Sequence, residues 1–176
     1  MDIKKPLYWI SFLIILLCSF SLQAQDKKKS DQAYKKGMQF FAQGKTKEAI
    51  KSFDIAIKED SSFVDSWIKR GFMRGMVGDF EGEMNDYNHV IKMYPDHVNA
   101  YISRGGAYNR LSDYEKGIAD FNKALELDPD NQEAYNNRGF AKKGLGDKDG
   151  ACDDWNKSKQ KGNAEAKIIF KNNYCK

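Results

Sequence analysis

The sequence predicts an all-α fold, an α-solenoid of four helix-turn-helix repeats closed by a C-terminal capping helix. A glycine recurs every 34 residues, an aromatic residue follows each glycine after sixteen residues, and a small residue follows it after seven. The three columns are Gly37, Gly71, Gly105 and Gly139, then Phe53, Tyr87, Phe121 and Trp155, and finally Gly44, Gly78, Ser112 and Gly146. Coincident columns at one such period are typical of stacked helix pairs.

Each column has a physical role within a helix pair. The first glycine lies where two antiparallel helices approach closely, and the aromatic residues fill the space between neighbouring helices. The second small residue, followed by Asp79, Asp113 or Asp147, ends one helix and caps the next. Pro95 and Pro129 end the second helices of their repeats. The predicted helices span residues 31–43, 46–59, 65–77, 80–93, 99–111, 114–127, 133–145, 148–160 and about 164–173.

These helices divide the chain into consecutive segments. The repeats are predicted at residues 30–63, 64–97, 98–131 and 132–163, followed by a capping helix and tail at residues 164–176. A polar, basic linker at residues 25–29 precedes the first repeat.

The first 24 residues have the anatomy of a secretory signal peptide. Lys4 and Lys5 form a positive start, residues 7–22 are nearly all apolar, and Ala24 offers a small residue for cleavage before Gln25. The apolar run is shorter than the roughly 20 residues that span a bilayer as a helix, so an uncleaved signal anchor is the second interpretation. We therefore expect an exported protein, periplasmic or secreted, that is not inserted in a membrane after cleavage.

Composition and motifs disfavour several classes of function. The 29 basic and 25 acidic residues give a net charge of only +4 and alternate along the chain, so no nucleic-acid partner is expected. His89 and His97 are the only histidines, and their spacing of eight residues does not suit a metal site on one helix. No strained Gly-x-Ser-x-Gly turn is present. We predict that the chain is not an enzyme and binds no cofactor or metal.

The repeats also resemble a known family. The chain is similar to tetratricopeptide repeats above all in two segments, WIKRGFMRGMVGDFEGEMNDYNHVIKMYP from Trp67 and YISRGGAYNRLSDYEKGIADFNKALELDP from Tyr101. The resemblance extends over roughly residues 30–163. It implies a right-handed superhelix of stacked helix pairs whose inner surface holds a peptide or protein, but it implies no particular ligand.

The resemblance further implies a ligand groove along the first helices of the repeats. The implied groove residues are Tyr34, Met38, Phe41, Ile68, Phe72, Met76, Ile102, Asn109, Arg110, Asn136, Phe140 and Lys143. This groove begins apolar and becomes polar and basic toward its C-terminal end, and apolar anchors with a polar rim suit a bound peptide. The alternative is that several of these residues only pack against neighbouring helices.

One subgroup of the family clamps the C-terminal carboxylate of chaperones with a set of Lys, Asn and Arg residues. The matching positions are Tyr34, Met38, Lys69, Asn99 and Ser103 in repeats one to three, and Ile68, Phe72, Ser103, Glu133 and Asn137 in repeats two to four. Neither set supplies the clamp, so the chaperone carboxylate is not the expected ligand.

The resulting functional hypothesis is an adaptor of the cell envelope. It would hold a partner protein or extended peptide through Phe72, Met76, Phe140, Arg110 and Lys143. The first alternative is a structural subunit of an envelope assembly, or a homo-oligomer whose groove holds a second copy. A more remote alternative is an enzyme acting on envelope polymers, for which the sequence shows no site.

Two sets of charged residues predict internal ion pairs. Arg74 and Glu83 both depart from the family pattern in the same repeat, and we expect them to compensate each other as a pair. A second set couples an arginine column to an aspartate column, within a repeat or with the adjacent repeat. The members of this set are Arg70, Arg104 and Arg138, with Asp86, Asp120 and Asp154.

A disulfide is predicted between Cys152 and Cys175. They are the only cysteines left after removal of the signal peptide, and export places them in an oxidising compartment. Counted from Asn163 in the connecting turn, Cys152 lies eleven residues back and Cys175 twelve forward, so an antiparallel hairpin brings them to the same end. The alternative is two unpaired small hydrophobic residues.

Overall fold

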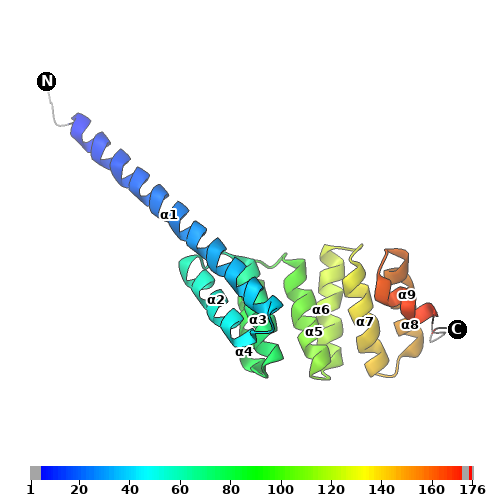
Figure 1. The fold of residues 1–176 in the computed structure, drawn as a ribbon. Coiled ribbons are helices and arrows are strands. Elements are labelled where there is room, and N and C mark those ends of the chain that lie inside the picture. The colour runs from blue at the N-terminus through cyan, green and yellow to red at the C-terminus, as the bar shows by residue number, and fades with distance from the viewer. Residues whose placement is uncertain (1–4, 172–174, 176) are drawn as a thin grey trace. The chain divides into compact units, whose positions relative to one another are not determined.

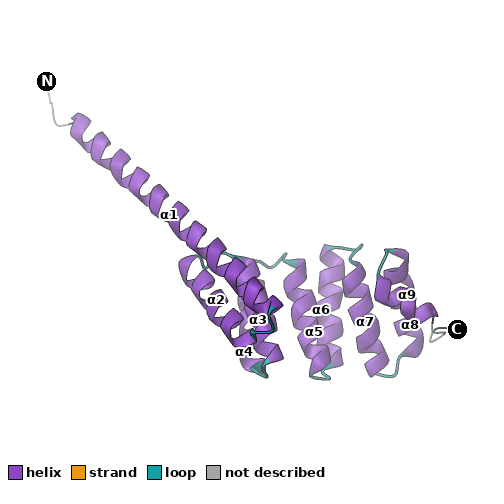
Figure 2. Ribbon diagram, in the orientation of Figure 1, coloured by secondary structure: helices purple, strands orange, loops and turns teal. Residues whose placement is uncertain are grey.

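The structure is a computed structural model that describes the backbone of residues 5–171 and 175, and the side chains of residues 23–170 and 175. All regular structure in this described part is helical, which confirms the all-α class (Figure 1, Figure 2). The helices are α1 (Lys5–Ala42), α2 (Thr46–Glu59), α3 (Val64–Met76), α4 (Phe80–Met93), α5 (Val98–Arg110), α6 (Tyr114–Leu127), α7 (Gln132–Gly144), α8 (Lys148–Gln160) and α9 (Ala164–Lys171).

The predicted helix boundaries agree closely with these ranges. Helices α2, α4, α6 and α8 begin and end at the predicted residues, while α3, α5 and α7 begin and end one residue earlier than predicted. The main difference is α1, which begins at Lys5 and continues through residues 25–29, where a linker was expected. The predicted signal peptide, residues 1–24, lies almost entirely outside the residues whose side chains are described. In the described part of the chain, no helix is long and apolar enough to cross a membrane.

The chain forms two compact units, Met1–Arg70 and Gly71–Lys176. In the first unit, α1 packs against α2. Ser30 donates a hydrogen bond from Oγ to the carbonyl oxygen of Ala56 at 2.9 Å, which secures the packed part of α1 to α2. A Cβ atom at Gly37 would lie 2.7 Å from the Phe53 ring, so the glycine is required for the close approach of the two helices.

The second unit repeats this packing. Gly105 faces the Phe121 ring, and a Cβ atom there would lie 2.7 Å from it. Helices α5 and α6 bury Phe121 completely, and α7 and α8 bury Trp155 in the same way. The indole nitrogen of Trp155 donates to the carbonyl oxygen of Asn136 at 3.1 Å, so its one polar atom is satisfied inside the core. The pairing of glycine and aromatic columns is therefore the main packing contact within each helix pair.

The predicted turn chemistry is present before α4 and α8, whereas Asp113 precedes α6 without a side-chain cap hydrogen bond. Gly78 and Gly146 each have a φ of +83°, a left-handed conformation that favours glycine and ends α3 and α7. Asp79 and Asp147 then cap α4 and α8, and each accepts a backbone N–H three residues later at 2.9 Å. His97 caps α5 in a similar way, with Nδ1 accepting from the amide of Ala100 at 3.2 Å.

Two arginines of the predicted column, Arg104 and Arg138, pair with the aspartate of their own repeat, and Arg70 contacts Asp54 of the preceding repeat at 2.6 Å. Arg104 holds Asp120 through two hydrogen bonds of 2.7 and 2.8 Å, and Arg138 holds Asp154 through two of the same lengths. Arg104 also donates to Asn88 Oδ1 at 2.7 Å, sixteen residues before it in the chain. Each of these guanidinium groups therefore joins its own repeat to the preceding one, since Arg138 contacts Asn122 in the same manner.

The predicted cysteine pair meets at the C-terminal end of the second unit. Cys152 and Cys175 are joined as a disulfide, with their Cα atoms 5.6 Å apart. Helix α9 lies against α8 and buries Ala166 next to Trp155. Its Phe170 is partly buried in the same cluster, with the Lys159 ammonium 3.8 Å from the ring centre. The end of the core is thus covered by α9.

Candidate binding groove

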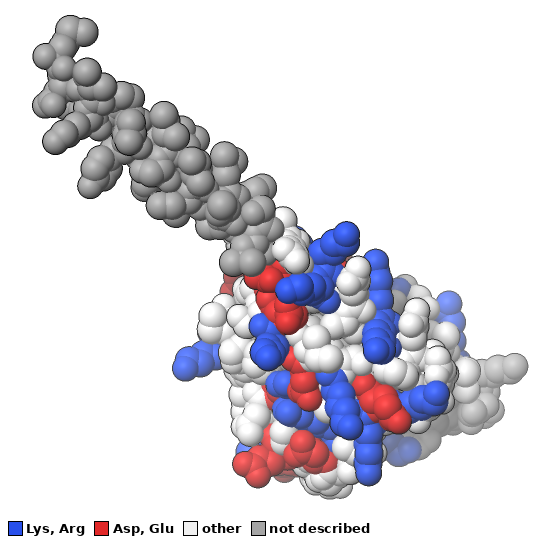
Figure 3. All heavy atoms as spheres, turned by 60° about the vertical axis from the view of Figure 1, so that its left-hand side comes forward, with Lys and Arg blue, Asp and Glu red and all other residues white. Residues whose placement is uncertain are grey.

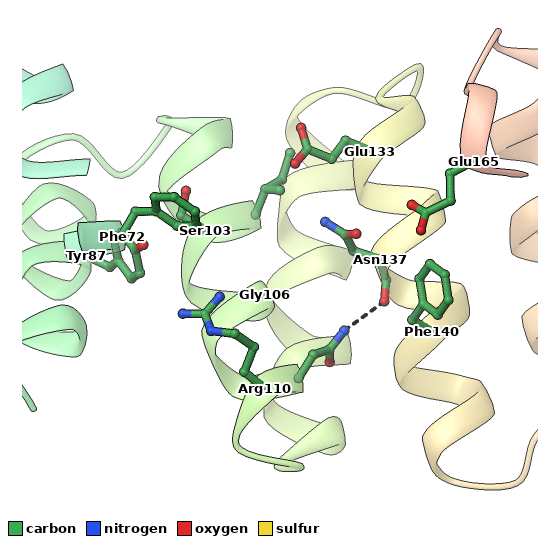
Figure 4. Close-up of a pocket in the computed structure, with 11 residues that line it drawn as sticks. Phe72, Tyr87, Ser103, Gly106, Arg110, Glu133, Asn137, Phe140 and Glu165 are labelled. Atoms are coloured by element: carbon green, nitrogen blue, oxygen red, sulfur yellow. Dashed lines mark hydrogen bonds between the residues drawn. The ribbon is translucent and has the colours of Figure 1, made fainter. Parts of the chain in front are cut away.

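A hollow of about 420 Å³ opens on the first helices of the second unit (Figure 4). We call it the groove pocket. Side chains from α3, α4, α5, α7 and α9 line it, so it is assembled from several repeats and the terminal helix. The lining residues are Phe72, Tyr87, Ile102, Ser103, Gly106, Asn109, Arg110, Glu133, Asn137, Phe140 and Glu165.

Aromatic side chains form two walls of the groove pocket. Figure 4 shows the Phe72 ring on one side of the hollow and the Phe140 ring on the other. Phe72 is 41% exposed and presents apolar surface to the hollow. Phe140 is half-buried because its ring packs edge-to-face on Trp155, with the ring centres 5.2 Å apart. The pocket therefore offers two apolar contacts that face a ligand from opposite sides.

One residue of the groove pocket lining, Arg110, forms an ion pair with a buried glutamate. The carboxylate of Glu83 is only 1% exposed and pairs with the guanidinium of Arg110, which comes from the next repeat. Burial, together with the negative charge of Glu83, raises the pKa of the neighbouring Tyr87 hydroxyl. Arg110 itself is 44% exposed. Its charge is thus largely engaged in compensating a buried carboxylate.

This arrangement corrects the predicted Arg74–Glu83 pair. Arg74 instead donates to Asp86 Oδ1 at 2.9 Å and to the carbonyl oxygen of Gly82 at 3.3 Å. In the last repeat Lys142 occupies the equivalent position and contacts Asp154 at 2.8 Å, so this cation–aspartate contact recurs. The prediction was wrong because neighbouring helical positions point in different directions, and Arg74 faces Asp86 while Glu83 faces Arg110.

Space for Glu83 comes from Gly75, which lies next to it in the same repeat. A Cβ atom at Gly75 would collide with the Glu83 carboxylate. In the next repeat the sizes are exchanged, because the larger Asn109 stands opposite Gly117, where a Cβ atom would lie 2.5 Å from Asn109 Oδ1. These two positions therefore vary in opposite directions from one repeat to the next. Asn109 also donates to the carbonyl oxygen of Asn137 at 2.9 Å, which ties α5 to α7.

Two glutamates that the groove prediction did not include complete the pocket. Glu133 belongs to the first turn of α7 and Glu165 to the first turn of α9, and both are exposed. The buried Asn136 donates from Nδ2 to Glu165 Oε2 at 2.6 Å, which orients that carboxylate. Glu165 was missed because it lies on the terminal helix, beyond the repeats that define the groove positions.

Of the twelve predicted groove residues, five line the groove pocket: Phe72, Ile102, Asn109, Arg110 and Phe140. Asn136 is buried behind it and acts through Glu165. Met76 and Lys143 are exposed residues outside the lining. The other four, Tyr34, Met38, Phe41 and Ile68, belong to the first unit. There, the Tyr34 ring packs on Phe63, with the ring centres 4.9 Å apart.

The surface shows no separation of charge by sign on the face drawn in Figure 3, where basic and acidic side chains intermingle. Within the described part of the chain, no three His, Cys, Asp or Glu residues are grouped so that they could hold a metal ion.

Comparison with known proteins identifies similar repeats. Two family models match the sequence, one described as TPR repeat over residues 105–146 and one described as tetratricopeptide repeat over residues 33–62. No curated protein matches the chain at a significant level.

Several solved structures share the fold, a helical repeat solenoid. TTC0263, a thermophilic TPR protein of Thermus thermophilus, has 17% identity and a TM-score of 0.68, over 73% of this chain and 72% of that one. A structure of MamA has 21% identity and a TM-score of 0.67, over 95% and 98%. The first TPR of Spaghetti (RPAP3), bound to an HSP90 peptide, has 27% identity and a TM-score of 0.63, over 68% and 95%.

Proposed function

Because this chain belongs to the tetratricopeptide repeat family, whose members generally serve as protein–protein interaction modules, we propose that it is an exported adaptor. Its groove pocket would bind an extended peptide segment of a partner protein. The observation that carries this proposal is the pair of aromatic side chains, Phe72 and Phe140, that face each other across one open hollow. Exposed aromatic anchors in a concave site are the usual source of binding energy in peptide recognition.

A solved relative supports peptide binding in general but not the same peptide. The Spaghetti domain was determined with an HSP90 peptide. In this chain the positions expected for a carboxylate clamp include Phe72, Ser103, Glu133 and Asn137, which line the groove pocket. None of these four is basic, and one is acidic. We therefore propose a peptide ligand of different chemistry in the same kind of groove.

Photocrosslinking in the native host tests the groove directly. A crosslinking amino acid at Phe72 should capture a partner protein, and the same amino acid at Phe80 should not. Phe80 is the matched control because its exposed fraction, 43%, is similar to that of Phe72, whereas its side chain lies outside the pocket lining. Equal capture from both positions would contradict groove binding. Capture of a second copy of this chain would instead favour the homo-oligomer.

Substitution of the anchors is the second test. Phe72→Ala with Phe140→Ala should abolish partner binding and leave helix content nearly unchanged, whereas Phe80→Ala with Met93→Ala should leave both unchanged. If the double variant unfolds, Phe140 is mainly a core residue. Partner binding by the single variant Phe72→Ala then tests the groove.

Export rests on the anatomy of residues 1–24. The mature protein should begin near Gln25, which N-terminal sequencing of the protein from its native compartment would establish. An intact Met1 on membrane-bound protein would favour the signal anchor instead.

A further inference from the structure

The charges of the groove pocket do not balance. Arg110 is the only basic residue in the lining, and it pairs with the buried Glu83. Glu133 and Glu165 add two further carboxylates, and neither forms an ion pair within the part of the chain that the structure describes. After the internal pair is set aside, the pocket presents two negative charges without a protein counter-ion.

The two carboxylates lie at the same rim of the hollow. Figure 4 shows Glu133 and Glu165 on its upper side, with Asn137 between them and the Phe140 ring below Glu165. The hydrogen bond from the buried Asn136 orients Glu165 through a fixed donor, so this carboxylate is not simply a mobile surface group. A cation at this rim would meet two acceptors and an aromatic face together.

We infer that the groove pocket recognises a basic side chain, Lys or Arg, within an extended peptide of the partner. This inference rests on the proposed function and specifies its ligand. The ammonium or guanidinium group lies between Glu133 and Glu165, and the aliphatic part of the side chain crosses the Phe140 ring. A neighbouring apolar residue of the peptide packs against Phe72. An acidic peptide would meet the like charges of Glu133 and Glu165. The only cation of the groove pocket, Arg110, is engaged with Glu83.

The inference also gives the terminal helix a role in binding. Glu165 belongs to α9, and the disulfide between Cys152 and Cys175 joins the segment after α9 to α8. Helix α9 therefore covers the end of the core and supplies one of the two acceptors of the site.

The rival explanation is that both glutamates only stabilise their helices. Each lies in the first turn of a helix, where a carboxylate compensates the helix dipole. The chain offers matched controls, because Glu81 and Glu115 are exposed first-turn glutamates of α4 and α6 outside the groove pocket. The pair of variants to compare is Glu133→Gln/Glu165→Gln and Glu81→Gln/Glu115→Gln, which change the net charge equally.

The probe is a displayed library of random twelve-residue peptides, selected on the oxidised, exported protein. We expect the selected peptides to carry Lys or Arg beside apolar residues. A fluorescein-labelled copy of the most enriched peptide should bind Glu133→Gln/Glu165→Gln about tenfold more weakly than the wild type, as two charge pairs of moderate strength predict. Binding to the Glu81→Gln/Glu115→Gln control should stay within about twofold of the wild type. Added salt should weaken wild-type binding more than that of the groove variant.

Two further outcomes separate this inference from the proposed function. If the selected peptides are acidic or neutral, or if both glutamine pairs bind them as the wild type does, the basic-ligand inference is wrong. In that case loss of binding in Phe72→Ala/Phe140→Ala would still support the groove. If no peptide is selected, or if the phenylalanine variant binds normally, the proposed function fails as well.

Discussion

The ion pair between Arg110 and Glu83 should contribute measurably to the free energy of unfolding. Arg110→Met removes the guanidinium and keeps most of the aliphatic bulk. It leaves the Glu83 carboxylate, which is 1% exposed, without the cation that compensates its burial. The substitution therefore tests whether Arg110 has a structural role besides its place in the pocket lining.

The magnitude follows from the burial of the two partners. Removing one partner of a fully buried ion pair costs about 3–5 kcal/mol, because the other charge stays buried and uncompensated. Arg110 is 44% exposed, so water reaches part of this pair. We therefore expect Arg110→Met to lower the free energy of unfolding by about 2–3 kcal/mol, below the fully buried range.

A double-mutant cycle in urea isolates the interaction. Glu83→Gln keeps an acceptor of the same shape, so alone it should cost only about 1 kcal/mol. Combined with Arg110→Met it should remove most of the loss, because no charge is then left buried. Lys123→Met is the control. Lys123 pairs with Glu126 at 2.8 Å on the exposed surface, where an ion pair contributes little to stability.

Either of two results would show that Arg110 does not compensate Glu83. One is an Arg110→Met protein as stable as Lys123→Met. The other is a double variant whose loss equals the sum of the two single losses, since independent effects would mean that the two side chains do not interact energetically.

Three further predictions concern the second unit. Replacing Cys152 and Cys175 by serine should lower the free energy of unfolding by about 3 kcal/mol in the chain-entropy model, since the bridge spans 23 residues. Denaturation with and without reductant measures this, and two free thiols in peptide mapping would contradict the bridge. Asp154→Asn should destabilise the protein by about 2–3 kcal/mol at pH 7. Burial raises the pKa of Asp154, but hydrogen bonds from Arg138 and Lys142 outweigh it and hold the pKa below its usual range. The wild-type advantage is therefore complete above the unfolded pKa and disappears as pH falls through the folded one, which acid titration of both proteins would show. Gly105→Ala should cost about 1–3 kcal/mol despite the higher helix propensity of alanine, because its Cβ would lie 2.7 Å from the Phe121 ring. An unchanged melting temperature would argue against this close packing.

Most of the fold was predictable because each repeat solves the same packing problem. A glycine packs under an aromatic ring between the two helices of each repeat, so the period of 34 residues locates every such helix pair. Left-handed glycines then mark the ends of α3 and α7, and capping aspartates mark the starts of α4 and α8. The predicted bounds of α2 to α8 agree with the structure to within one residue. The start of α1 was not predicted, because residues 25–29 carry polar side chains that suit a solvated helix as well as a linker.

The candidate site was only partly predictable. Positional analogy found Phe72, Asn109 and Phe140, because these positions of the first helices face the same side in successive repeats. It assigned Arg110 to the ligand, whereas the structure pairs this residue with Glu83. It also omitted Glu165, which belongs to no repeat.

The sequence by itself determined the helices, their order and the cysteine pair, because these depend on spacing along the chain and on local backbone chemistry. Only the tertiary structure decided which charges meet. Arg110 and Glu83 are 27 residues apart and belong to different repeats, and Asn136 and Glu165 are 29 apart. Such contacts depend on the direction in which each side chain leaves its helix, and adjacent positions differ in that direction by about 100°. A periodic pattern specifies the repeating scaffold, whereas the charge of its pocket depends on these single long-range pairings.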